Sequence, residues 1–193
     1  GYLANKLHQL GAKVIGVDFS IRMLEIAGSR YPNIDFRLDD CCQLSTVSDE
    51  EFDLLISNYV LMDMPDLDGA VDSFYRVLKP KGVAIIVFSH PCFDVGNSES
   101  LEGGTRRTFT WEHPYFEIGK RVNTPWSHFT DEFIWFHRPL SDYFKSFKRS
   151  GFLLEDFEEP RIREDKYHLV EDERKLNQLS SWPYSVVFKL NKT

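Results

Sequence analysis

The stretch Gly11-Ala12-Lys13-Val14-Ile15-Gly16-Val17-Asp18-Phe19-Ser20 decides the fold class of this chain. Residues 14–17 form a short, mostly β-branched apolar run, which indicates a buried strand. Asp18 ends that run, and Ser20 stands where the N-cap of a following helix is expected. Apolar residues at helical spacing continue beyond Ser20. A buried strand that leads directly into an amphipathic helix is typical of α/β proteins with a parallel sheet.

The same alternation of elements continues on both sides of this stretch. Before it, Leu3, Leu7 and Leu10 lie at helical spacing, and Gly11 predicts the end of that helix. The later predictions are strands at 34–38 and 52–57, a helix over 71–78, a turn at 79–82, a strand at 83–88, a helix over 140–147, and strands at 152–157 and 184–190. This order predicts an α/β three-layer sandwich with a mainly parallel, doubly wound sheet and an antiparallel last strand at the sheet edge.

Composition narrows the class of protein. A length of 193 residues suits one domain over 1–193. The net charge of −7 and the absence of a long Lys/Arg run argue against a nucleic-acid partner. No apolar stretch reaches the length of a membrane span and no secretory signal opens the chain, so we expect no membrane association. Three cysteines, two of them adjacent, are neither a disulfide framework nor a zinc pattern, which indicates a cytoplasmic protein without a metal site.

Residues 89–138 have a different texture from the rest of the chain. They carry Gly, Pro, Asn, Ser and many aromatic residues with weak periodicity, which predicts a loop-rich insertion that acts as a substrate lid. The aromatic clustering suits an apolar or cationic substrate; the alternative is a satellite hydrophobic cluster. The candidate substrate-binding residues are Trp111, Tyr115, Trp126, Trp135 and Arg138. The charge-dense segment 155–173 predicts a solvated face or a mobile loop.

Polar residues follow the predicted strands where ligands bind in doubly wound folds. The Asp18 carboxylate can accept hydrogen bonds from ribose hydroxyls, or it can act as a helix-capping acid. His90 directly follows the strand at 83–88 and is a candidate for taking a proton from a substrate. The alternative for His90 is a hydrogen-bonded residue that shapes its loop. His137 is the second catalytic candidate, and it is equally compatible with a surface position.

Five segments resemble, in order, the motifs of class I S-adenosylmethionine-dependent methyltransferases. They are 11–24, 40–44, 52–61, 76–82 and 151–152. The resemblance implies that Asp18 binds the cofactor ribose, that Phe19 and Met23 flank the adenine, and that Asp40 meets the adenine amino group. The full set of implied cofactor-binding residues is Gly1, Asp18, Phe19, Ser20, Met23, Asp40, Cys41, Cys42, Asn58 and Tyr59. For Cys41 and Cys42 the alternative is a pair of buried small residues, and for Asn58 a strand-end cap.

The resemblance covers residues 1–90 well and 139–190 loosely, with one departure. The family's first strand and most of its glycine-rich loop have no counterpart here, and only Gly1 matches the end of that loop. A sheet without this central strand would have a gap. The segment Asn58–Leu61 also lacks the pattern of an Asn or Asp, two prolines and an aromatic residue that is usual in members that methylate nucleic-acid bases.

The resemblance implies methyl transfer from S-adenosylmethionine to a small-molecule acceptor through an oxygen, nitrogen or carbon atom. Two alternatives remain open. The first is an NAD(P)-dependent oxidoreductase, because an acid after the second strand also suits that cofactor. The second is a non-catalytic module that keeps the fold. The sequence leaves the oligomeric state undetermined.

Overall fold

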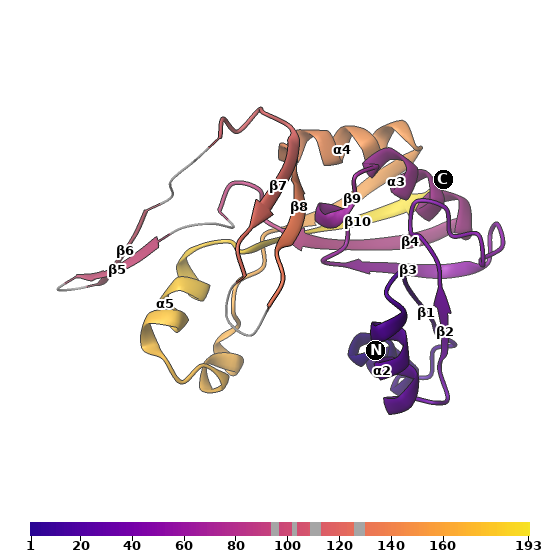
Figure 1. Cartoon of the computed structure of the whole chain (residues 1–193), viewed down its shortest axis with the longest axis horizontal. Coiled ribbons are helices and arrows are strands. Elements are labelled where there is room, and N and C mark those ends of the chain that lie inside the picture. The colour runs from indigo at the N-terminus through magenta and orange to yellow at the C-terminus, as the bar shows by residue number, and fades with distance from the viewer. Residues whose placement is uncertain (94–96, 102–103, 109–112, 126–129) are drawn as a thin grey trace.

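The strands of the central sheet fall into two separate groups. A computed structural model describes all of residues 1–193 except 94–96, 102–103, 109–112 and 126–129. Strands β1 (Ile15–Asp18) and β2 (Asp35–Leu38) pair in parallel. Strands β3 (Phe52–Asn58), β4 (Leu78–Ser89), β10 (Ser185–Lys192) and β9 (Phe152–Glu158) form a second sheet in that spatial order. The predicted α/β fold is confirmed, with crossover helices between parallel strands (Figure 1).

The last strand is antiparallel, as predicted, but it does not lie at the edge. β10 pairs antiparallel with β4 on one side and with β9 on the other, so β9 is the edge strand. The predicted edge position is therefore wrong. Val186, Phe188 and Leu190 are buried in the core, and a strand that buries one face while neighbours cover both edges still shows the alternating pattern of an edge strand.

The β1–β2 pair and the four-stranded sheet share no strand in the described part of the chain. Among the described residues, no strand pairs with the outer edge of β1 or with the outer edge of β3. Helix α1 (Tyr2–Gln9) begins the chain and ends before Gly11, whose φ of +92° confirms the predicted stop. The apolar face predicted for this helix is not buried, since Leu10 is 85% exposed and α1 has no buried residue. The helix has no strand of the four-stranded sheet to pack against.

The core lies between the four-stranded sheet and two helices. Helices α3 (Leu67–Val77) and α4 (Leu140–Arg149) pack together on one face of that sheet (Figure 1). Phe88 of β4 stacks on Tyr143 of α4 with 4.2 Å between ring centroids. The opposite face of β4 is only half-buried. Helix α2 (Ile21–Arg30) packs on the β1–β2 pair, and Ser20 caps it as predicted by accepting a hydrogen bond from the N–H of Met23 at 3.4 Å.

The predicted turn at 79–82 interrupts β4. The register moves from Phe52 opposite Leu78 to Leu54 opposite Val83, so the intervening residues of β4 bulge out. Lys81 adopts a left-handed φ of +65° within this bulge.

The insertion contains more structure than the sequence predicts. Two hairpins form there: β5 (Asn97–Leu101) with β6 (Gly104–Thr108), and β7 (Gly119–Asn123) with β8 (Phe133–His137). In β7 and β8 only His137 is buried, so this hairpin leaves little periodicity in the sequence. β8 packs against the 3-10 turn η1 (Leu61–Asp63). The charged region after β9 likewise contains η2 (Glu164–Leu169) and helix α5 (Glu173–Ser181).

Within the described part of the chain, no helix combines the length and the apolar character that a membrane crossing requires.

Candidate functional site

The carboxyl ends of the parallel strands gather the candidate residues at one edge of the fold. The pairing of β1 with β2 places Asp18 beside the residues that lead into Asp40. The pairing of β3 with β4 places Asn58 near the end of β4. The loops that follow β2 and β3 touch, because the Cys41 Sγ lies 3.0 Å from the Met64 Sδ. The two parts of the sheet therefore present their strand ends toward neighbouring loops.

Asp18 takes part in the turn that follows β1. Its Oδ1 accepts a hydrogen bond from the backbone N–H of Ser20 at 2.8 Å, and the residue is half-buried. One oxygen of the Asp18 carboxylate thus acts as the helix-capping alternative predicts. A carboxylate offers further acceptor positions on its second oxygen, so this contact leaves Asp18 able to bind a hydroxyl group.

Two large apolar side chains next to Asp18 are exposed. Phe19 is 71% exposed and Met23 is 54% exposed. Both follow the strand end that carries the acid, on the turn and the first helical turn of α2. Exposed apolar groups beside a carboxylate suit a ligand that has a flat apolar ring and a polar sugar.

Asp39 organises the loop after β2, and the sequence analysis missed it. This buried carboxylate accepts hydrogen bonds from the N–H of Asp40 (2.8 Å), the hydroxyl of Ser45 (3.1 Å), and the N–H (2.6 Å) and hydroxyl (2.7 Å) of Thr46. Burial works to raise the pKa of Asp39, but the bonds from Thr46 and Ser45 outweigh it and lower the pKa to about 2. The signal in the sequence is a second acid before Asp40, followed by two hydroxyl residues.

The Asp40-Cys41-Cys42 segment forms a tight turn inside that loop. Asp40 is exposed, and its Oδ1 accepts a hydrogen bond from the N–H of Cys42 at 2.8 Å. One ligand atom from each of the three residues lies within 4.8 Å of the others, so the group could hold a metal ion. Burial raises the pKa of Cys41 to about 12 and that of Cys42 to about 11. Thiols that stay protonated near neutral pH are weak metal ligands, which favours the alternative of buried small residues.

Asn58 and Tyr59 stand at the end of β3, and both are exposed. Tyr59 has a left-handed φ of +55°, and its N–H donates to the carbonyl of Val87 at 2.7 Å. Its phenol shares a hydrogen bond with the hydroxyl of Ser185 in β10. The ring is thereby held across the ends of β4 and β10. A non-glycine residue in this region is strained, and strain of this kind concentrates at functional sites.

Gly1 lies against helix α2. A Cβ placed on it would come within 2.9 Å of the Cβ of Ala27 and 3.0 Å of the Tyr31 ring. Close packing against helix α2 therefore explains why a residue without a side chain stands at this position.

His90 is fixed by both of its ring nitrogens. Its Nδ1 accepts a hydrogen bond from the N–H of Cys92 at 3.1 Å, so the neutral ring carries its proton on Nε2. Nε2 lies 2.9 Å from Glu159 Oε1 and donates to it. The side chain is buried. This geometry favours the alternative in which His90 shapes the loop between β4 and the insertion.

His137 and two of the aromatic candidates, Tyr115 and Trp135, are held by hydrogen bonds in and next to the insertion. His137 is buried, so the surface alternative is wrong for it, and its Nε2 donates to the carbonyl of Tyr115 at 2.7 Å. The Tyr115 hydroxyl accepts a hydrogen bond from the N–H of Leu140 at 2.9 Å. Trp135 donates to the side chain of Asn123 at 3.2 Å. Trp111 and Trp126 lie outside the described residues.

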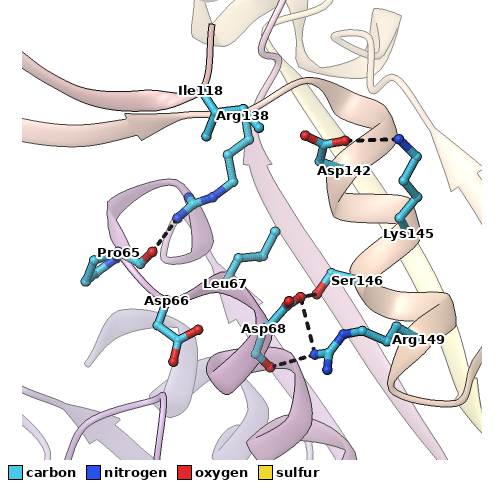
Figure 2. Close-up of a pocket in the computed structure, with 10 residues that line it drawn as sticks. All are labelled: Pro65, Asp66, Leu67, Asp68, Ile118, Arg138, Asp142, Lys145, Ser146 and Arg149. Carbon is cyan, nitrogen blue, oxygen red and sulfur yellow. Dashed lines mark hydrogen bonds and ion pairs between the residues drawn. The ribbon is translucent and has the colours of Figure 1, made fainter. Parts of the chain in front are cut away.

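Arg138 borders a cavity of about 510 Å³ between the N-terminal end of α3 and one face of α4. Figure 2 shows acidic and basic side chains facing one another across it. Lys145 pairs with Asp142 at 3.3 Å, and Arg149 pairs with Asp68 at 3.3 Å. Arg138 could be predicted from the sequence. These paired charges could not, because charged residues at helical spacing also occur on ordinary solvent-exposed helix faces.

Comparison with known proteins finds similarity in the N-terminal part of the chain. Residues 1–86 match the family described as "Methyltransferase domain". This part of the chain is also similar to the demethylmenaquinone methyltransferase of Chlorobaculum tepidum, with 39% identity over 77 residues. The match covers 40% of this chain and 31% of that protein. The chain thus spans about a third of the length of the curated relatives that it matches.

Nearly the whole chain shares its fold with solved structures. The S-adenosylmethionine-dependent methyltransferase from Mesorhizobium loti aligns with a TM-score of 0.80 and 22% identity, over 100% of this chain and 86% of that one. The putative S-adenosylmethionine-dependent methyltransferase from Listeria monocytogenes aligns with a TM-score of 0.74 and 21% identity, over 94% and 80%. The chain therefore shares the Rossmann-like α/β fold of these structures, and the predicted fold class is confirmed.

Proposed function

We propose that this protein transfers a methyl group from S-adenosylmethionine to a small-molecule acceptor. The observation that carries the proposal is the group of two acids and two exposed apolar side chains at the strand ends of the N-terminal part of the chain. Asp18 and Asp40 supply carboxylates, and Phe19 and Met23 supply apolar faces. A nucleoside needs both kinds of contact, one for its hydroxyls and one for its base.

The side chains divide the work of holding this cofactor. Asp18 would bind the ribose hydroxyls, and Asp40 the amino group of the adenine. Phe19 and Met23 would flank the ring, with Ser20 ordering the turn between them. Asn58 and the strained Tyr59 would face the methionine part. When bound, S-adenosylmethionine supplies a methyl group on a positively charged sulfur, so the protein contributes mainly orientation and exclusion of water.

The open edges of β1 and β3 support one more element in the whole protein. Each edge leaves backbone donors and acceptors unpaired within the described chain. A parallel strand between them would join the two sheets, and its following loop would reach Gly1. We expect that strand and a glycine-rich loop to complete the cofactor site.

The insertion 89–138 is proposed to act as the substrate lid. Its strand β8 packs against η1, the turn that follows β3 and the proposed cofactor site. Tyr115, Trp135 and Arg138 would contribute to the acceptor pocket, together with Trp111 and Trp126. His90 and His137 are the weaker candidates for a catalytic role, because each is held by hydrogen bonds that order its loop.

The proposal of a small-molecule acceptor is argued from this chain's own residues and not from the relatives' names. The similarity to demethylmenaquinone methyltransferases covers the N-terminal part, whereas acceptor contacts are expected from the insertion. The acidic net charge supports a small molecule over a nucleic acid and, with the cysteine usage, a cytoplasmic setting.

Calorimetric titration of the whole protein with S-adenosylhomocysteine and with NADH tests the proposal. We expect heat from S-adenosylhomocysteine binding and none from NADH. Binding of NADH alone would favour the oxidoreductase alternative. Binding of neither ligand would favour the non-catalytic module.

A further inference from the structure

Three buried polar side-chain atoms of the described chain have no hydrogen-bond partner. They are Ser57 Oγ, Asp63 Oδ1 and Arg138 Nη1. Leaving such an atom unpaired costs about 1–3 kcal/mol, and more for charged groups, so each one calls for an explanation. Asp63 and Arg138 carry opposite charges, yet no ion pair forms between them.

Arg138 is anchored beside Asp63 in the fold. The arginine is 7% exposed, and its Nη2 donates to the carbonyls of Met64 at 2.6 Å and Pro65 at 2.8 Å. Figure 2 shows the side chain reaching down to Pro65 between Ile118 and Leu67. Because Met64 and Pro65 directly follow Asp63, these bonds hold the guanidinium against the end of η1 and leave Nη1 unpaired.

The buried phenol of Tyr143 links the two charged groups. Burial is the main cause that raises the pKa of Tyr143; the charge of Arg138 and its side-chain hydrogen bond to the phenol work against it, and the charge of Asp63 adds to it. Asp63 and Arg138 therefore lie within electrostatic reach of the same phenol. Tyr143 itself is fixed by stacking on Phe88, so this cluster sits above the last residues of β4.

The cluster lies between the proposed cofactor site and the insertion. Asp63 ends the turn η1 that follows β3. In that turn, the Met62 Sδ receives the N–H of Ser89 at the end of β4, at 3.5 Å. β8 packs on the other side of η1 and brings Arg138. An acceptor bound under the insertion would approach the strand ends at this place.

We propose that Asp63 and Arg138 form a polar subsite for an acceptor that carries a hydroxyl group next to a carbonyl oxygen. The hydroxyl donates to the Asp63 carboxylate, and the carbonyl accepts from Arg138 Nη1. This inference rests on the proposed methyl transfer. One neutral group with a donor and an acceptor satisfies both unpaired atoms, whereas a carboxylate ligand would set a second negative charge beside Asp63.

The subsite also gives Asp63 a part in the reaction. The acceptor O–H bond breaks, and its proton passes to the Asp63 carboxylate. The electron pair on the oxygen forms the bond to the methyl carbon while the carbon–sulfur bond breaks, and its pair stays on the now neutral sulfur. Burial raises the pKa of Asp63 to about 6, so the group is ionised at neutral pH yet basic enough to accept a proton.

The test uses 2-hydroxyacetophenone as the probe, with acetophenone and 2-methoxyacetophenone as matched compounds that lack the hydroxyl proton. Binding is followed by NMR titration at pH 7.5, with and without saturating S-adenosylhomocysteine. We expect the hydroxyl compound to bind at least about tenfold more tightly than either matched compound, a difference of the size of one hydrogen bond to a charged group. Equal affinities, or no binding of the probe, would overturn the subsite.

Variants then assign the contacts. Asp63→Asn and Arg138→Gln should each weaken probe binding at least about tenfold. Asp142→Asn and Arg149→Gln remove charges that line the cavity bordered by Arg138 but pair elsewhere, and should leave the affinity within about twofold. Unchanged binding in Asp63→Asn would contradict the proposal, and that variant is expected to fold because it removes a buried charge.

A pH series separates a proton-accepting role from simple packing. Probe affinity in the wild type should fall as the pH drops through about 6, and this dependence should vanish in Asp63→Asn. The other ionisable groups facing Asp63 are Arg138 and Tyr143, with His137 on the adjoining strand. A pH dependence that persists in Asp63→Asn would overturn the role of Asp63. S-adenosylhomocysteine binding is scored separately, so its loss would count against methyl transfer while the probe still decides the subsite.

Discussion

The carboxylate of Asp39 accepts hydrogen bonds from both the backbone N–H and the hydroxyl of Thr46, at 2.6 and 2.7 Å. These contacts close the loop that presents Asp40 and the two cysteines after β2. Asp39→Ala should therefore lower the free energy of unfolding by about 1–3 kcal/mol and weaken S-adenosylhomocysteine binding. Asp35→Asn is the control: it breaks an exposed ion pair with Arg37 and should cost less than about 1 kcal/mol. Urea unfolding curves of both variants measure the difference, and equal losses would contradict this role of Asp39.

Asp39 also makes the stability of the fold depend on pH in the acid range. Its folded pKa of about 2 lies below the unfolded value, so its stabilisation is present above the unfolded pKa and is lost as the pH falls through about 2. The wild type should therefore lose more stability than Asp39→Asn between pH 4 and pH 2. Parallel curves for the two proteins in this range would contradict the assignment.

Asp63 imposes the opposite dependence. Its folded pKa of about 6 lies above the unfolded value, so the stability linked to Asp63 is full below the unfolded pKa and is lost as the pH rises through about 6. Asp63→Asn should be more stable than the wild type at pH 7.5, by about 1–2 kcal/mol after allowance for solvent screening, and should lose this advantage at pH 4. Thermal unfolding at the two pH values measures this, and an advantage independent of pH would contradict it.

Phe88 joins β4 to helix α4 and should be among the most sensitive core positions. It is fully buried and stacks on Tyr143. Phe88→Ala should lower the free energy of unfolding by about 3–5 kcal/mol because it leaves a cavity between sheet and helix. Phe116→Ala, at an exposed phenylalanine of the insertion, should cost less than about 1 kcal/mol. A small loss in Phe88→Ala would show that the core can collapse around the missing ring.

Most strands and helices outside the insertion could be predicted, because they bury a patterned face. Residues 14–17 and 83–88 read as strands since tertiary packing and local preference agree there. The position of β10 inside the sheet could not be predicted, because strand order depends on pairing between distant segments. The β7–β8 hairpin of the insertion was missed because it buries little and so leaves no period in the sequence.

The candidate site shows the same division. Asp18 and Asp40 could be named from their places at strand ends, where the fold class determines where ligands bind. Asp39 and Asp63 could not, because their importance comes from burial and from partners in other segments. His90 was named from its place after β4, but its ring is committed to Cys92 and Glu159. A strand-end position therefore identifies where a residue lies more reliably than what it does.

A crystal structure of the whole protein with S-adenosylhomocysteine tests the account most directly. We expect both ribose hydroxyls within hydrogen-bond distance of the Asp18 carboxylate and the adenine ring beside Phe19 and Met23. A nucleoside bound away from the ends of β1 and β2, with Asp18 still facing only its own turn, would contradict the proposed methyl transfer.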